Sequence, residues 1–310
     1  MIYCAFYIDI LQMQATDALQ RFMFEHAEIR GEIIHLSQSY QTIMKQHAYP
    51  TMVKHLLGEA LMSCALIAGS LQFEGEVSLQ FQGNDDLPLL LVQCDHELHI
   101  RGFAKFEPQR TAEAYTQAFL NGKLSLVINP YHQTQAYQSV VPLSSISMAD
   151  NIMHYFTQSE QISTRVWLAS DDEKTAGMLL QLLPTNNTEE RENFWEHAVK
   201  LGETITEHEL LTLDNETILH RLYHDSELRL FPAKHIQFRC RCNIEKMKQV
   251  LSVLGEKDIQ ALIKEKGSVD IHCEFCNRQY SFDPIDVTLL FKTGAHDASI
   301  DVSYVINKKK

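Results

Sequence analysis

The sequence lacks three features that would assign it to a specialised class of protein. Its Lys and Arg residues form no basic stripe apart from the terminal residues 308–310, and the formal net charge is −13. Because phosphate binding needs clustered cations, nucleic acid is not an expected partner. The longest apolar run, at residues 61–69, is too short to span a bilayer, and residues 1–17 lack the features of a secretory signal. We therefore expect a cytosolic protein with no membrane partner.

Motifs of enzymes are also missing. The sequence contains no phosphate loop, no nucleophile elbow and no recognisable acid–base pair. Its 15 histidines are scattered, and none of their spacings fixes a metal site. We therefore expect that the protein is not an enzyme.

The residues that are present suit a globular protein of two or three domains, since 45% of the 310 residues are apolar and 22% are charged. Residues 1–184 alternate helical and strand patterns, which predicts an α+β N-terminal domain with antiparallel sheet. The expected elements are a core helix at 49–71, a hairpin within 71–94, strands at 122–130 and 137–143, and an amphipathic helix at 147–161.

The pattern changes after Pro184. Residues 185–235 are rich in charge and predict a linker of short helices, with capping-box signatures at Asn187 and at Thr206. Helices shorter than about 12–15 residues are marginal alone in water, so their stability must come from docking. Such a segment could come loose if its support were removed, although an ordinary helical connector has the same pattern.

Residues 236–291 predict a small C-terminal domain, and residues 292–310 form a tail that we expect to be disordered. The expected elements of the domain are a helix capped by Asn243 and ended by Gly255, a helix ended by Gly267, a strand–turn–strand unit at 268–282, and a helix starting near Pro284.

Four of the seven cysteines form two close pairs, Cys240 with Cys242 and Cys273 with Cys276. Paired cysteines in a cytosolic protein are metal ligands or redox centres before they are structural disulfides. Four thiolates suit tetrahedral Zn²⁺ and leave no open position for a catalytic water. The sequence therefore predicts a zinc site on these four residues. His272 is a neighbouring strand residue and a less favoured ligand.

The spacing of the first pair leaves two roles open for this zinc. In an extended strand, residues i and i+2 lie about 6.6–6.8 Å apart at Cα, which is the upper limit for a disulfide. Joining Cys240 to Cys242 therefore demands local bending, so oxidised and zinc-bound backbones would differ. A switch needs that difference, but the spacing alone favours a permanent structural zinc over a redox switch.

The other three cysteines, Cys4, Cys64 and Cys94, stand alone in apolar surroundings. Isolated cysteines of this kind are usually small buried hydrophobes, so we expect them to pack in the core.

Several segments occur in a characteristic order along the chain. They are "IRGEIIHL" (29–36), "HAYPTMVKHLLGEAL" (47–61), "HIRGFAKF" (99–106), "YQSVVPL" (137–143), "YFTQSEQI" (155–162), "LLQLLP" (179–184) and the two cysteine pairs. Together they resemble the heat-shock protein 33 family of redox-regulated chaperones. The resemblance covers nearly the whole chain. It departs from the family at Asn243, where Ser is usual, in the longer loop "QGNDDLP", and in the tail from residue 292.

This resemblance implies an ATP-independent holdase that is inactive while reduced and zinc-bound. It implies that oxidation forms the disulfides Cys240–Cys242 and Cys273–Cys276, releases Zn²⁺ and loosens the linker. Unfolding client proteins are then the expected partners, and the oxidised protein is expected to form a homodimer. A static zinc-stabilised interaction module without redox switching is the alternative.

Overall fold

A computed structural model describes residues 17–71, 74–132, 135–143, 145–184 and 189–292. The chain divides into two compact units, Met1–Arg239 and Cys240–Lys310. Helices and strands are mixed in both, which confirms the expected α+β class. The division into residues 1–184, 185–235, 236–291 and 292–310 stays a prediction.

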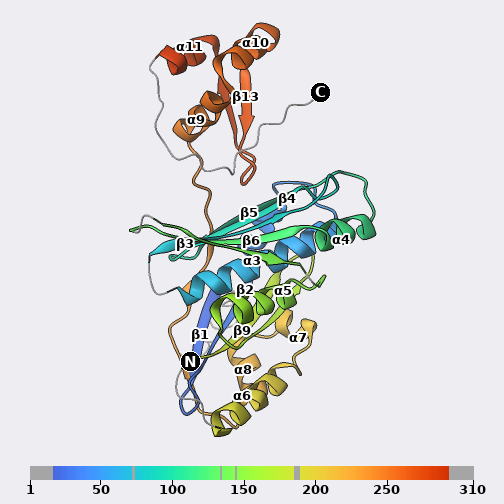
Figure 1. Cartoon of the computed structure of the whole chain (residues 1–310), viewed down its shortest axis with the longest axis vertical. Helices are drawn as coiled ribbons and strands as arrows, with labels where there is room; N and C mark the ends of the chain where they lie inside the picture. The colour runs from blue at the N-terminus through green and yellow to red at the C-terminus, as the bar shows by residue number, and fades with distance from the viewer. Residues whose placement is uncertain (1–16, 72–73, 133–134, 144, 185–188, 293–310) are drawn as a thin grey trace, which may run out of the picture. The chain divides into compact units, whose positions relative to one another are not determined.

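The N-terminal unit contains two sheets with helix α3 (Thr51–Ser70) between them (Figure 1). Sheet A has the strand order β10-β1-β2-β9-β8, with β11 also paired to β1, and sheet B has the order β12-β5-β4-β3-β6-β7. Sheet A comprises β1 (Ala18–Phe24), β2 (Ile29–Leu36), β8 (Thr164–Ser170), β9 (Thr175–Leu182), β10 (Leu228–Leu230) and β11 (Lys234–His235). Sheet B comprises β3 (Gly75–Gln82), β4 (Leu89–Asp95), β5 (His99–Lys105), β6 (Lys123–Pro130), β7 (Tyr137–Pro142) and β12 (Gln237–Phe238).

Helix α3 is apolar nearly all round because it faces a sheet on either side. It is the one helix in the described part of the chain that is long and apolar enough to cross a membrane, yet 72% of its apolar stretch is buried inside the protein. Its place confirms the expected core helix. The main core, which lies between the two sheets, draws on α3 and on the inner faces of both sheets.

The expectation for the isolated cysteines is confirmed for two of them. Cys64 on α3 and Cys94 on β4 are both fully buried. Burial raises the pKa of each thiol above its ordinary value, which keeps both protonated and unreactive. Cys4 lies outside the described residues.

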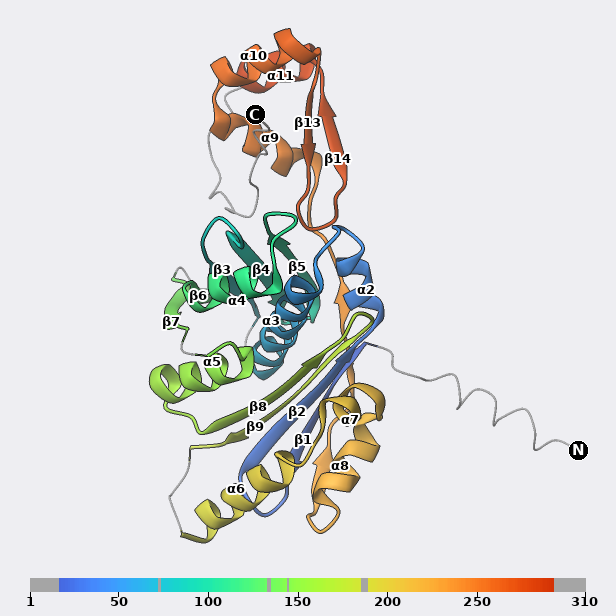
Figure 2. The ribbon, with the colours of Figure 1, turned by 90° about the vertical axis from the view of Figure 1, so that its right-hand side faces the viewer.

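Three helices of the expected linker cover the outer face of sheet A (Figure 2). They are α6 (Glu189–Gly202), α7 (Glu207–Thr212) and α8 (Asn215–Tyr223). The expected capping box is present at Thr206, whose side chain accepts from the Glu209 amide, whereas Asn187 lies outside the described residues. The segment is not wholly helical, because β10 and β11 follow α8 and pair with β1.

A second core lies between these helices and sheet A. Its aromatic centre is Tyr223, whose ring centroid lies 5.1 Å from that of Phe24 and 6.4 Å from that of Phe22. Phe194 adds an edge contact to Phe24 at 5.5 Å. The other buried members include Ile29, Ile33, Trp195, Ala198, Leu210, Ile218 and Leu222. The linker helices are therefore held by apolar contacts.

Among the described residues of this unit, the remaining helices are α2 (Gln38–Met44), α4 (Ala112–Leu120) and α5 (Met148–Tyr155). The helix expected at 147–161 is α5 extended by a π-helical turn, η1 (Phe156–Glu160), and it ends where Gln161 adopts a left-handed conformation. The expected hairpin is β3 and β4, and the two further expected strands are β6 and β7.

In the described part of the C-terminal unit, three helices pack on a two-stranded sheet. They are α9 (Ile244–Leu254), α10 (Glu256–Lys266) and α11 (Pro284–Lys292), with β13 (Val269–His272) and β14 (Gln279–Phe282). Its fully buried residues include Met247, Leu251, Ile259 and Phe282. Asn243 caps α9 as expected, and Gly255 and Gly267 end α9 and α10 with positive φ. Of the tail expected to be disordered, residues 293–310 lie outside the described residues.

Candidate metal centre

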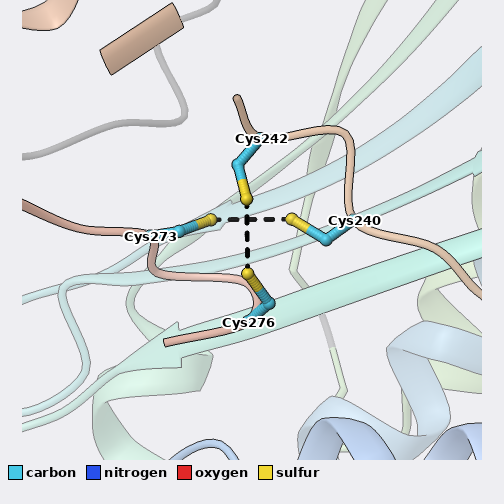
Figure 3. Close-up of side chains that lie close together, drawn as sticks. All are labelled: Cys240, Cys242, Cys273 and Cys276. Atoms are coloured by element: carbon cyan, nitrogen blue, oxygen red, sulfur yellow. Dashed lines mark hydrogen bonds between the residues drawn. The ribbon is translucent and has the colours of Figure 1, made fainter. Parts of the chain in front are cut away.

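The four paired cysteines come together at one point in the C-terminal unit (Figure 3). The Sγ atoms of Cys240 and Cys273 are 3.6 Å apart, and those of Cys242 and Cys276 are 3.4 Å apart. All four Sγ atoms lie within 4.8 Å of one another. Sulfurs bound to tetrahedral zinc at about 2.3 Å would lie roughly 3.8 Å apart, so this cluster could hold a metal ion.

Two short loops place these thiols. Cys240 and Cys242 lie in the loop before α9, and Asn243, directly after them, fixes the start of that helix. Cys273 and Cys276 lie in the turn between β13 and β14. The turn is closed by the Asn277 amide, which donates to the Cys273 carbonyl at 2.7 Å. Both loops are therefore anchored to regular structure, as a preorganised site requires.

The thiols are also tied to one another and to a neighbouring tyrosine. Hydrogen bonds from the thiols of Cys273 and Cys276 lower the pKa of Cys240, which makes Cys240 the preferred thiolate. The side-chain hydrogen bond with Cys240 raises the pKa of Cys276 to about 12. The Tyr280 hydroxyl donates to Cys242 Sγ at 3.1 Å and so stabilises negative charge on that sulfur.

The expected ligands are therefore brought together, and His272 is not in the cluster. A soft, four-sulfur set suits Zn²⁺ by its chemistry and would satisfy the metal completely. The shape of the site leaves the metal no open position, so the chemistry it could supply is cross-linking and thiolate protection.

A second group of possible ligands, Asp95, Glu97 and His99, has a structural explanation. These residues form the turn between β4 and β5. Asp95 Oδ1 accepts from the amides of Glu97 and His99, and its Oδ2 lies 3.1 Å from His99 Nδ1. The other ring nitrogen, Nε2, accepts from the Arg239 guanidinium at 3.2 Å. The imidazole is thus used as a bridge between Asp95 and Arg239.

The structure adds one residue that the sequence did not single out, His35 on β2. Its Nε2 lies 2.7 Å from the Leu210 carbonyl on α7, and its Nδ1 lies 2.7 Å from the Asn215 side chain on α8. It therefore joins sheet A to two linker helices. Its partners are far away in sequence, so no local pattern could have indicated it.

Comparison with known proteins decides the family. A family model described as "Hsp33 protein" matches residues 17–283, which is most of the chain and includes all four paired cysteines. The chain belongs to the Hsp33 family. Membership confirms the resemblance found in the sequence and supports a chaperone role.

Hsp33 relatives cover almost the full length. The "33 kDa chaperonin" of Pseudomonas savastanoi pv. phaseolicola is 41% identical over 295 residues, covering 93% of this chain and 98% of the relative. The "33 kDa chaperonin" of Pseudomonas aeruginosa is 40% identical over 285 residues, covering 90% and 96%. The crystal structure of a 33 kDa chaperonin from Thermotoga maritima superposes with a TM-score of 0.77 at 23% identity, covering 91% of this chain and all of that one, so it supports the fold.

Proposed function

We propose that this Hsp33 chain is a redox-regulated, ATP-independent holdase that is inactive while Cys240, Cys242, Cys273 and Cys276 hold Zn²⁺. The convergence of four thiols in one small unit carries the proposal. The unit follows directly on a segment whose apolar side chains are docked on sheet A. The partners are unfolding client proteins, and we expect a cytosolic location and a dimer in the oxidised form.

Zn²⁺ held by the four cysteines would act as a cross-link within the C-terminal unit. Bound to four thiolates, the metal would join the loop before α9 to the turn between β13 and β14. In small metal-dependent domains, this coupling of binding to folding contributes roughly 10–16 kcal/mol at neutral pH. The unit is thus expected to be folded only while these sulfurs stay reduced.

Oxidation converts the thiols to disulfides. Each molecule of peroxide takes two electrons from one pair of thiols, forms one S–S bond and leaves as two molecules of water. The first attack forms a sulfenic acid, which a neighbouring thiolate resolves. Every Sγ has the other three within 4.8 Å, so a resolving partner is always close.

The pairing decides whether oxidation loosens the unit. A bond between the two loops, such as Cys240–Cys273, would keep them joined and close a long stretch of chain, which restricts the unfolded state. Bonds within each loop, Cys240–Cys242 and Cys273–Cys276, close only short loops and leave the two loops separate. The proposed switch releases the metal and also loosens the C-terminal unit, so it calls for disulfides within each loop.

The surface that the proposed switch uncovers is the outer face of sheet A. When α6, α7 and α8 leave it, the aromatic side chains of Phe22 and Phe24 lose their cover. A large exposed apolar patch is the kind of surface that binds unfolding polypeptides. The alternative, a static zinc-stabilised module, would keep this face covered in every redox state.

Zinc release and chaperone activity measured together test the proposal. Peroxide at an elevated temperature should release close to one Zn²⁺ per chain and should allow the protein to suppress light scattering by a heat-unfolded client. Mass spectrometry of peptides should find the two disulfides within loops. Retention of zinc under peroxide, with partner binding unchanged, would support the static module instead.

Acid should weaken the docking of the linker through His35. Burial lowers the pKa of His35, and the hydrogen bonds to Leu210 and Asn215 only partly oppose this effect. The docked form thus prefers the neutral ring. The contribution of His35 is complete above the ordinary pKa of about 6.5 and is lost as the pH falls below it. As the pH falls from 7.5 to 5.5, the protection factors of the amides in α7 and α8, taken relative to the intrinsic exchange rate at each pH, should decrease.

The His35→Gln variant is the control for this pH effect. It cannot gain a proton in this range, so its protection factors should change less between the two pH values. Buried carboxyls act in the opposite direction, because desolvation raises the pKa of Glu32 to about 8 and that of Glu59 to about 7. Their contribution favours the folded form at low pH. An identical acid response in both proteins would contradict the role of His35.

A further inference from the structure

The residues directly before Cys240 form a segment held to both sheets of the N-terminal unit. We define Leu228–Arg239 as the latch segment. Its β10 and β11 pair antiparallel with β1 of sheet A, and its β12 pairs parallel with β5 of sheet B. It therefore occupies the outer edges of two edge strands at once.

Main-chain hydrogen bonds hold most of the latch segment. The Phe231 amide donates to the Arg21 carbonyl at 2.9 Å, and the Ile236 amide donates to the Asp17 carbonyl at 2.9 Å. On sheet B, the Gln237 amide donates to the Leu98 carbonyl at 3.2 Å, and a further bond joins Arg239 to Ile100 at 3.1 Å. Such bonds recognise an extended backbone of almost any sequence.

Side chains add to this attachment mainly at Ile236 and at the two arginines near the ends of the segment. Leu230 and Phe231 remain 42% and 39% exposed, whereas Ile236 is fully buried in the main core. An arginine near each end of the segment also contacts a side chain of the N-terminal unit. Arg229 forms a two-pronged ion pair with Glu25 at 2.6 and 2.8 Å, and Arg239 contacts His99, which Asp95 holds.

The latch segment is basic and apolar in composition. It contains Arg229, Lys234 and Arg239 and no acidic residue, although the whole chain has a formal net charge of −13. From His235 to Arg239, the apolar residues Ile236 and Phe238 alternate with polar residues. The edges of β1 and β5 therefore accept an extended, apolar and basic segment in the folded protein.

We infer that these edges are the binding site for extended segments of unfolded clients, which add to β1 and β5 as strands once the latch segment leaves. This inference rests on the proposed function, because the same oxidation must release the latch segment. A vacated edge exposes unpaired N–H and C=O groups, and such an edge is a template for another chain. The favoured client segment is apolar, carries Lys or Arg, and places an aliphatic side chain in the position of Ile236.

A synthetic peptide of residues 228–239 tests the inference on the full-length protein. A fluorescently labelled copy should bind the oxidised protein and should compete with a heat-unfolded client. It should bind the reduced protein far more weakly, because the chain's own latch segment occupies the edges. Binding is measured by anisotropy, and aggregation of the client by light scattering in the same samples.

Two N-methylated peptides separate strand addition from general apolar binding. In an antiparallel pair, hydrogen-bonded positions alternate with positions that face away. The Phe231 amide donates to Arg21, so the Leu230 amide faces away from β1. A methyl on the Phe231 nitrogen should weaken binding about tenfold, whereas a methyl on the Leu230 nitrogen should have little effect.

The possible results are distinguishable. If the oxidised protein does not suppress aggregation, the proposed function fails, whatever the peptides do. If it does suppress aggregation but the two methylated peptides bind equally, or no peptide competes with the client, strand addition is wrong and the proposed function stands. Oxidised dimers that exclude the peptide would assign the edges to a second copy of the chain and would also overturn the inference.

Discussion

Replacement of Cys240 by serine should remove the metal from the C-terminal unit and, with it, most of the unit's fold. The hydroxyl of serine is a poor zinc ligand, so three thiolates would remain. The apolar core of this unit is small, and the zinc contribution of roughly 10–16 kcal/mol is comparable to the entire stability of a typical domain. The amides of α9 and α10 should lose their protection from hydrogen exchange, and the metal content should fall well below one ion per chain.

His272→Ala is the matched control for Cys240→Ser. His272 lies on β13 next to Cys273, and its position in the sequence makes it a possible alternative zinc ligand. Its side chain is exposed and lies outside the cluster. This variant should keep its metal and its protected amides. The N-terminal unit should stay folded in both variants. A Cys240→Ser protein with a full metal content, protected α9 and no activity until oxidised would contradict the assignment.

Gly202→Val should undock the linker helices without any oxidation. Gly202 lies at the end of α6, and a Cβ atom there would come within 2.7 Å of the Trp167 ring on β8 and 3.1 Å of the Tyr223 hydroxyl. Overpacking of this kind costs about 1–3 kcal/mol, which shifts the docking equilibrium by about 5- to 150-fold. The reduced variant should therefore suppress aggregation of a heat-unfolded client, and its α6 should exchange its amides faster than that of the unchanged protein.

Glu196→Val controls for the introduced side chain. It places the same valine at an exposed position of the same helix. Replacing glycine in a helix raises helix propensity, so a purely local effect at Gly202 would stabilise α6. Activity of the reduced Gly202→Val protein therefore has to come from the contact with Trp167. Equal, oxidant-dependent behaviour of both variants would show that docking of α6 does not control activity.

The parts of this molecule that the sequence predicted well are those with local causes. Asn243 and Gly267 mark helix ends through hydrogen bonds and backbone conformations that involve only a few neighbouring residues. The apolar residues of α3 recur at helical spacing within one continuous stretch of sequence, so this helix was also predictable from local sequence alone. The four cysteines were assigned to one site because tetrahedral chemistry needs four sulfurs, and the two loops do bring them together.

The parts that were missed depend on contacts between distant residues. β10, β11 and β12 are only two or three residues long, so any alternation of apolar and polar residues in them is too short to detect. These strands form because β1 and β5 offer free edges for pairing. The bridge from His35 to α7 and α8 and the contact of Gly202 with Trp167 also join residues far apart in the chain. Such pairs are set by the tertiary fold, which one sequence does not reveal.

The two separate cores of the N-terminal unit allow it to melt in two steps. Among the described residues, the core between the sheets takes no buried side chain from α6, α7 or α8, whereas the core on the outer face of sheet A depends on them. The second core can therefore melt while the first stays intact. Under the proposed function, clients would be bound in the temperature interval between these two melting events, when the second core is open and the first still keeps the N-terminal unit folded.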